Sequence, residues 1–244
     1  MESDRLIPVA SRPLFAVLID GDNINAKHAE LILKEIASFA DPALLRVYGD
    51  WSDRGMKDWA STALDLGLGT HQVAANTKGK NATDIGLVID AMDILHRKQF
   101  DGFVLVSSDS DFTRLAARIR EEGLQVVGIG ESKAPASLRN ICNRFIFIEN
   151  IVKDVDVLGS AAKPGQATKE PVENAEPLII AAMDGIDPDA TVFHLGQLGQ
   201  SITALYPDFD CRTYGKKKLS DLVGSLKAFS IERDGTAIQV RRKG

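Results

Sequence analysis

The chain is poor in the residues that build disulfide frameworks, zinc sites and membrane spans. Its 244 residues include two cysteines, and its four histidines are scattered without metal-ligand spacing. A disulfide framework or a zinc site is therefore not expected, and a cytoplasmic location fits. The longest apolar runs, such as 14–19, are too short to cross a membrane. The N-terminal Met-Glu-Ser-Asp-Arg does not resemble a secretory signal.

The net charge of −5 is unevenly distributed along the chain. Residues 211–244 carry nine Lys or Arg and three Asp or Glu, a local charge of +6 (9 − 3). A basic segment on an acidic protein is typical of a nucleic-acid-binding surface, and an ordinary solvated tail is the alternative interpretation.

Residues 14–149 alternate between apolar runs and amphipathic patterns. The expected strands are 14–20, 43–49, 70–75, 102–108, 125–129 and 144–148, and the expected helices are 25–39, 54–67, 82–98, 111–122 and 135–142. Nearly continuous apolar strands that alternate with helices predict an α/β fold with an open parallel sheet covered on both faces. In the helix at 82–98, helical spacing predicts a buried stripe formed by Ile85, Val88, Ile89, Met92 and Leu95.

A change of pattern after residue 158 predicts a second domain. Residues 159–175 are rich in Gly, Pro, Ala and charge, as in a flexible linker. Helices are expected near 176–184, 193–205 and 216–228, and two strand-like runs then flank Asp234-Gly235, which favours a hairpin. The chain is therefore predicted to have a first domain at 1–158 and a small winged-helix domain at 176–244.

Four aspartates occupy positions where an open α/β sheet binds its ligands. Asp20 closes the first apolar run, Asp109 and Asp111 follow the run at 103–108, and Asp84 begins a helix. Ligands of such sheets bind beyond the carboxyl ends of the strands. Carboxylates gathered there repel one another unless a cation neutralises them, and an all-oxygen site favours Mg²⁺ or Mn²⁺. The alternative is that each aspartate only caps a helix or turn.

Further polar and aromatic residues surround these acids. Asn23 can orient a carboxylate or contact a scissile phosphate. Lys78, Lys80 and Asn81 precede Asp84 on a glycine-containing loop, where they can bind phosphates or form a solvated turn. Trp51 follows the second strand and can stack on a base or cover the edge of the core. For Trp59 we expect the core position.

Two kinds of phosphoester chemistry fit the acids. A divalent ion held by three or four carboxylates can activate water and stabilise charge on phosphorus, which predicts a nuclease. Asp20-Gly-Asp-Asn23 could also open a haloacid-dehalogenase-like phosphatase in which Asp20 is the nucleophile. That alternative lacks a cap insert and clear middle motifs.

Residues 12–150 resemble the LabA-like branch of the NYN family of PIN-like ribonucleases. The resemblance is carried, in family order, by Leu18-Ile-Asp-Gly-Asp-Asn23, Val47-Tyr-Gly-Asp-Trp51, Lys78-Gly-Lys-Asn-Ala-Thr-Asp84 through Asp90, and Val106-Ser-Ser-Asp-Ser-Asp-Phe112. It implies a PIN-like open parallel sheet and Mg²⁺- or Mn²⁺-dependent (endo)ribonuclease activity. It also implies metal binding by Asp20, Asp84, Asp109 and Asp111, with Asn23 in support.

Residues 176–242 resemble the LOTUS or OST-HTH domain, a winged-helix module. The resemblance is carried by Pro207-Asp-Phe209, Tyr214-Gly215, Lys218-Leu219 and Leu222. It implies RNA binding, or in some members contact with a protein partner. The basic groups available for RNA are Arg212, Lys216, Lys217 and Lys218 at a helix start, and Arg241, Arg242 and Lys243 after the wing. A non-catalytic RNA-binding adaptor is the alternative function from another class.

Overall fold

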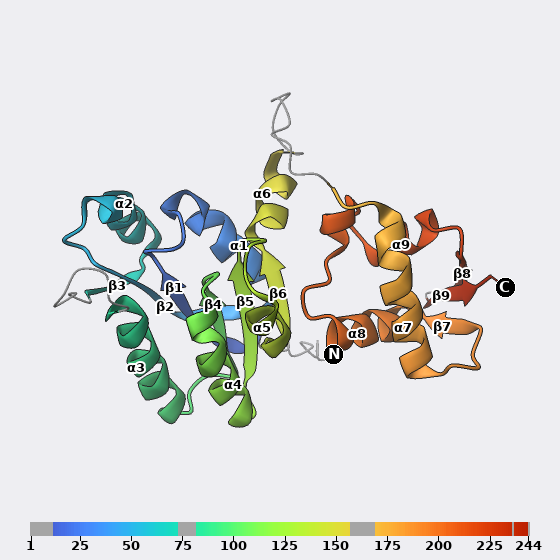
Figure 1. Cartoon of the computed structure of the whole chain (residues 1–244), viewed down its shortest axis with the longest axis horizontal. Coiled ribbons are helices and arrows are strands. Elements are labelled where there is room, and N and C mark those ends of the chain that lie inside the picture. The colour runs from blue at the N-terminus through green and yellow to red at the C-terminus, as the bar shows by residue number, and fades with distance from the viewer. Residues whose placement is uncertain (1–11, 73–81, 157–168, 236, 244) are drawn as a thin grey trace, which may run out of the picture. The chain divides into compact units, whose positions relative to one another are not determined.

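The computed structural model of the protein describes residues 12–72, 82–156, 169–235 and 237–243 (Figure 1). None of the helices in these ranges combines the length and the apolar character that a bilayer crossing requires.

The first three strands form one side of a parallel sheet. β1 is buried from Phe15 to Asp20, as expected of a strand covered on both faces. β2 pairs in parallel with β1 and with β3. Figure 1 shows α1 and α2 on one side of these strands and α3 on the other. The elements are β1 (Leu14–Asp20), the 3-10 turn η1 (Ala26–His28), α1 (Ala29–Phe39), β2 (Asp41–Gly49), η2 (Arg54–Met56), α2 (Lys57–Leu66), β3 (Gly69–Gln72) and α3 (Ala82–His96).

The sheet has the strand order β3-β2-β1-β4-β5-β6. This order reverses direction between β1 and β4, and the carboxyl ends of those two neighbouring strands therefore flank the switch point of the sheet. The predicted α/β fold is confirmed, although the sequence pattern did not indicate α6. The elements are β4 (Gly102–Val106), η3 (Ser110–Phe112), α4 (Thr113–Glu121), β5 (Gln125–Gly130), α5 (Ala136–Ile141), β6 (Arg144–Phe147) and α6 (Ile148–Asp156).

The predicted buried stripe of α3 is wrong in two positions. Ile85 and Ile89 are each 60% exposed. Apolar residues occur around most of this helix, so periodicity alone does not select the face that packs on the sheet. The buried face consists of Thr83, Leu87, Ala91, Ile94 and Leu95. Helical spacing of Phe112, Leu115, Ala116 and Ile119 in the sequence also predicts a buried stripe on the next helix, and all four residues are buried.

The C-terminal part has a core and a sheet of its own. Its three antiparallel strands have the order β7-β9-β8, and Gly235 turns the β8–β9 hairpin with φ 58°, a backbone angle that favours glycine. The winged-helix layout is confirmed. The elements are η4 (Val172–Ala175), α7 (Glu176–Ile186), β7 (Val192–His194), α8 (Leu195–Leu205), η5 (Cys211–Tyr214), α9 (Leu219–Ser225), β8 (Phe229–Asp234) and β9 (Ala237–Arg242).

Three details of this part differ from the expectation or extend it. Residues 192–194 form β7, which pairs with β9, although helix was expected from residue 193. Arg241 and Arg242 lie within β9, and not after the wing. Residues 172–175, at the end of the predicted linker, form η4, and Ala175 is fully buried. The domain boundaries at 158/159 and 175/176 stay predictions.

Candidate functional site

Asp20 is the last residue of β1 and is completely buried. Asn23 holds its carboxylate in place. The side-chain amide of Asn23 donates to Asp20 Oδ2 at 2.8 Å, and the Asn23 backbone amide donates to Asp20 Oδ1 at 3.3 Å. Asn23 therefore orients a carboxylate, one of the two roles considered for it.

Asp109 is fixed at the end of β4 by backbone and side-chain hydrogen bonds. Its amide donates to the hydroxyl oxygen of the buried Ser107 at 3.0 Å. Its Oδ1 accepts from the amide of Asp111 at 2.9 Å, so Asp109 is also the N-cap of η3. Capping and ligand binding are thus compatible for this residue, because the cap occupies only one carboxylate oxygen.

The start of α3 is tied to the ends of β1 and β2 through Asp22. The hydroxyl of Thr83 donates to Asp22 Oδ2 at 2.7 Å, and the amide of Asp50 lies 3.4 Å from Asp22 Oδ1. Asp22 is exposed, and it accepts hydrogen bonds from the start of α3 and from the loop after β2. This contact positions the residue that follows Thr83, which is Asp84.

Asp84, Asp109 and Asp111 are brought together. One carboxylate oxygen from each lies within 4.8 Å of the other two. We call these residues the three-acid cluster. Oxygens bound to one divalent ion at about 2.0–2.6 Å lie up to about 4–5 Å apart, so the cluster fits Mg²⁺ or Mn²⁺ in both spacing and donor type. Among the residues that the structure describes, Asp20 does not join this group.

A second acidic side chain of α3 has a different environment. Asp90 accepts hydrogen bonds from Arg46 and from the buried hydroxyl of Tyr48, and His71 Nδ1 lies 3.9 Å from its Oδ2. Burial alone would raise the pKa of Asp90, but the hydrogen bonds from Arg46 and Tyr48 outweigh it and hold the pKa below its ordinary value. Asp90 therefore fastens α3 to β2 through an ion pair with Arg46 and a hydrogen bond from Tyr48.

The two tryptophans have separate roles. Trp51 is half-buried after β2, where its indole N–H donates to the His71 carbonyl at 3.0 Å. This contact fixes the ring near the end of β3 while leaving part of it accessible. Trp59 is 2% exposed and donates to the Ile24 carbonyl at 2.8 Å, so the core position expected for it is confirmed.

The basic residues expected to bind RNA differ in their exposure and in their ion pairs. Lys78, Lys80 and Asn81 lie outside the residues that the structure describes. Lys216 is half-buried, and Lys217 and Lys218 are exposed. Three arginines of the C-terminal part are held by acids of the same part, through the pairs Arg212–Asp210, Arg241–Glu232 and Arg242–Asp184.

Two residues that support the site were not indicated by the sequence. Thr83 lies beside a predicted ligand, and only its burial with a hydrogen bond to Asp22 reveals its role. Gly130 ends β5, and a Cβ atom there would lie 2.5 Å from the carbonyl oxygen of Ser107. A glycine at that point allows β5 to approach the segment that carries Asp109.

Comparison with known proteins identifies the families. A crystal structure of a protein of unknown function from Vibrio parahaemolyticus is 19% identical, with a TM-score of 0.49, over 62% of this chain and 98% of that chain. No curated protein matches the chain. The NYN domain family matches residues 14–149, and the OST-HTH/LOTUS domain family matches residues 168–240. Both resemblances seen in the sequence are thereby confirmed: the chain belongs to the NYN domain family and carries an OST-HTH/LOTUS domain in its C-terminal part.

Proposed function

We propose that the protein is a ribonuclease that depends on Mg²⁺ or Mn²⁺ and hydrolyses RNA phosphodiester bonds. The observation that carries this proposal is the three-acid cluster at the switch point of the sheet. Membership of the NYN domain family supports it, because the resemblance to this family of PIN-like ribonucleases implies RNA cleavage. We include Asp20 as a fourth acid of the proposed site, because it ends β1, the strand beside β4.

The residues of the chain have distinct tasks in this proposal. Asp84, Asp109 and Asp111 would hold the ion, which when bound supplies an activated water and neutralises charge on the phosphate. Asn23 keeps the carboxylate of Asp20 oriented, and Ser107 fixes the backbone of Asp109. Since these supports are hydrogen bonds within the protein, the acids are arranged before substrate binds.

RNA cleavage with and without a divalent ion tests the proposal. We expect the full chain to cut single-stranded or structured RNA in Mn²⁺ and to lose cleavage in excess chelator. Asp84→Asn and Asp109→Asn should each reduce cleavage by about 100-fold or more, because each removes a charged ligand of the proposed ion. Asp93→Asn is the matched control, because Asp93 is an exposed acid on α3.

The failure modes of this experiment are distinct. RNA that is bound but never cut would indicate the non-catalytic adaptor. Hydrolysis of a small phosphate ester with formation of an aspartyl-phosphate would indicate the phosphatase. Cleavage that persists in excess chelator, or cleavage by Asp109→Asn at the wild-type rate in Mn²⁺, would refute the assignment of the acids.

The OST-HTH/LOTUS domain indicates RNA as the partner, and we propose that Lys217 and Lys218 contact its backbone. Both are exposed and form no ion pair with any residue in the described ranges, whereas Arg241 and Arg242 are already paired. Replacing both lysines with Gln should lower the slope of log affinity against log salt by about one per lost phosphate contact. Lys98→Gln, before β4, is the control.

No loss of affinity or slope in the double variant would remove these lysines from the RNA contact. A C-terminal domain without any RNA affinity at low salt would instead favour docking of a protein partner. A cytoplasmic location remains part of this proposal.

A further inference from the structure

Trp51 is held in one orientation at the carboxyl end of the parallel sheet. Its indole N–H donates to the His71 carbonyl at 3.0 Å, and its backbone amide donates to Gln72 Oε1 at 3.0 Å. The side-chain amide of Gln72 also donates to Asp50 Oδ1, at 3.1 Å. Both the ring and the backbone of Trp51 are therefore fixed by β3 before any ligand binds, which lowers the entropy cost of binding a ligand to the ring.

The anchor of Trp51 lies close to Asp20 along the same edge of the sheet. In the parallel register Asp20 is paired with Tyr48, and Tyr48 is paired with His71. Neighbouring strands are about 4.8 Å apart, so the His71 backbone that receives the indole lies about 10 Å from the backbone of Asp20. A strand of RNA that presents a phosphate to the acids can therefore place a nearby base on Trp51.

Trp51 differs from a tryptophan that serves only the core. Trp59 has that role, because it is 2% exposed and packs inside the domain. Trp51 is half-buried on the turn after β2, and residues 52–55, which follow it, are exposed. Part of a large apolar ring is thus left in contact with water, at a cost in hydrophobic free energy. A fixed and partly accessible ring is what a base needs for stacking.

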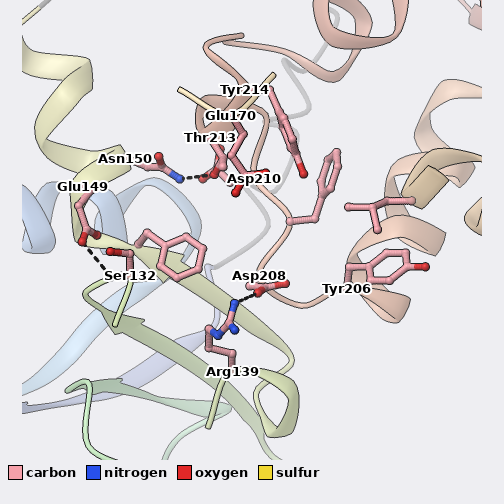
Figure 2. Close-up of a pocket in the computed structure, with 13 residues that line it drawn as sticks. Ser132, Arg139, Glu149, Asn150, Glu170, Tyr206, Asp208, Asp210, Thr213 and Tyr214 are labelled. Carbon is pink, nitrogen blue, oxygen red and sulfur yellow. Dashed lines mark hydrogen bonds and ion pairs between the residues drawn. The ribbon is translucent and has the colours of Figure 1, made fainter. Parts of the chain in front are cut away.

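The cavity of about 490 Å³ in Figure 2 is a less suitable place for a base. Its basic side chain, Arg139, already pairs with Asp208. The acids that line it are Glu149, Glu170, Asp208 and Asp210. This lining repels a phosphate backbone, although it includes rings such as that of Tyr206. Residues 50–57, which include Trp51, contain two acids and two basic residues and have no net charge (2 − 2), so a polyanion meets less repulsion there.

We propose that Trp51 stacks on an unpaired base of the RNA, next to the phosphate that the acids address. This inference rests on the proposed ribonuclease function and names single-stranded RNA as its substrate class. A base inside a duplex is covered by its neighbours on both faces and cannot reach the ring. Stacking is tolerant of base identity, because every base has a π-face. The preference is therefore for single strands and not for one sequence.

Tryptophan fluorescence of the full chain tests the stacking without cleavage. The chain carries Asp84→Asn and Asp109→Asn in excess chelator, which removes the proposed ion and two charges that would repel RNA. Both tryptophans lie within residues 14–149 and Trp59 is buried, so quenching reports on Trp51. We expect saturable quenching by an oligouridylate of about six nucleotides. A blunt RNA duplex, and inorganic polyphosphate, which has no base, should not quench.

The affinity of the same chain for a labelled oligouridylate separates the ring from other contacts. Adding Trp51→Leu should weaken binding by about tenfold, as for the loss of one stacked base. Trp51→Phe keeps a ring and should weaken binding by no more than about threefold. Tyr206→Leu is the matched control, because it removes a ring of the acidic cavity and should leave the affinity unchanged.

Several results would overturn the proposal. They are equal affinity with and without Trp51→Leu, an equal loss in Tyr206→Leu, no quenching by the single strand, or equal quenching by the duplex or the polyphosphate. The quenching measurement leaves Trp51 unaltered, so it decides the question even where a Trp51 variant is unstable. RNA that is cut by the wild type without stacking would remove Trp51 from the site but keep the nuclease. Stacking in a protein that never cuts RNA would instead favour the non-catalytic adaptor.

Discussion

Replacing Asp109 with Asn should stabilise the protein without metal and destabilise it relative to the wild type when metal is present. The substitution removes one charge from the three-acid cluster and keeps the Oδ1 that caps η3. Relief of repulsion should therefore be visible without loss of the cap, which an alanine would remove.

The size of the effect follows from the separation of the oxygens. At 4.8 Å, the largest separation in the cluster, two unit charges repel by about 0.9 kcal/mol in water and about 3.5 kcal/mol at an effective dielectric constant of about 20. Asp111 is exposed, which favours the lower figure. Since Asp109 repels two partners, the gain is about 2 kcal/mol, or a rise in melting temperature of about 4–8 °C.

Tryptophan fluorescence during heating is a suitable assay. The chain has two tryptophans, Trp51 and Trp59, and both belong to the domain that carries the acids. In chelator, Asp109→Asn should melt above the wild type. In Mn²⁺ at about 100 times its dissociation constant, the wild type should gain about 2.7 kcal/mol and the variant much less, which reverses the order. Asp93→Asn should follow the wild type in both conditions. A variant that melts below the wild type in chelator and shows the same response to Mn²⁺ would refute the repulsion and the site.

Three further variants test the supports of the site and its expected contacts with RNA. Asp90→Asn should lower the free energy of unfolding by about 1–3 kcal/mol in urea titrations, because Arg46 loses its partner in a half-buried place. The difference in free energy of unfolding between the wild type and the variant should be complete above about pH 4, the ordinary pKa of an aspartate, and should disappear as the pH falls through the lowered pKa of Asp90 in the folded protein. A difference that does not depend on pH would contradict this explanation. Lys78→Ala with Lys80→Ala should flatten the salt dependence of RNA binding by about one unit per lost phosphate contact, and an unchanged slope would make them ordinary surface lysines. Gly130→Ala should cost about 1–3 kcal/mol and weaken the response to Mn²⁺, since its Cβ would meet a backbone carbonyl at 2.5 Å; an unaltered melting curve would show that the strand end yields easily.

The elements and the ligand candidates of this protein could be predicted from local patterns. An apolar run such as β1 must be covered on both faces, and its alternation with helices leaves an α/β sheet as the expected arrangement. Asp20 ends β1, and Asp109 and Asp111 follow β4 within a few residues, so their positions can be read from the order of the chain. The Asp-Gly turn of the hairpin was likewise visible, since a positive φ is a local property of the backbone.

The choice of faces and partners was decided only by the tertiary structure. Ile85 and Ile89 have the spacing of a core stripe, yet the packing of α3 on the sheet buries Leu87 and Ala91 instead. Periodicity states that a helix has an apolar face, whereas the neighbour that covers it lies elsewhere in the chain. The same holds for Asp90, whose partner Arg46 is 44 residues away. Hydrogen bonds and ion pairs over such separations depend on where the fold places both groups, which local pattern does not encode.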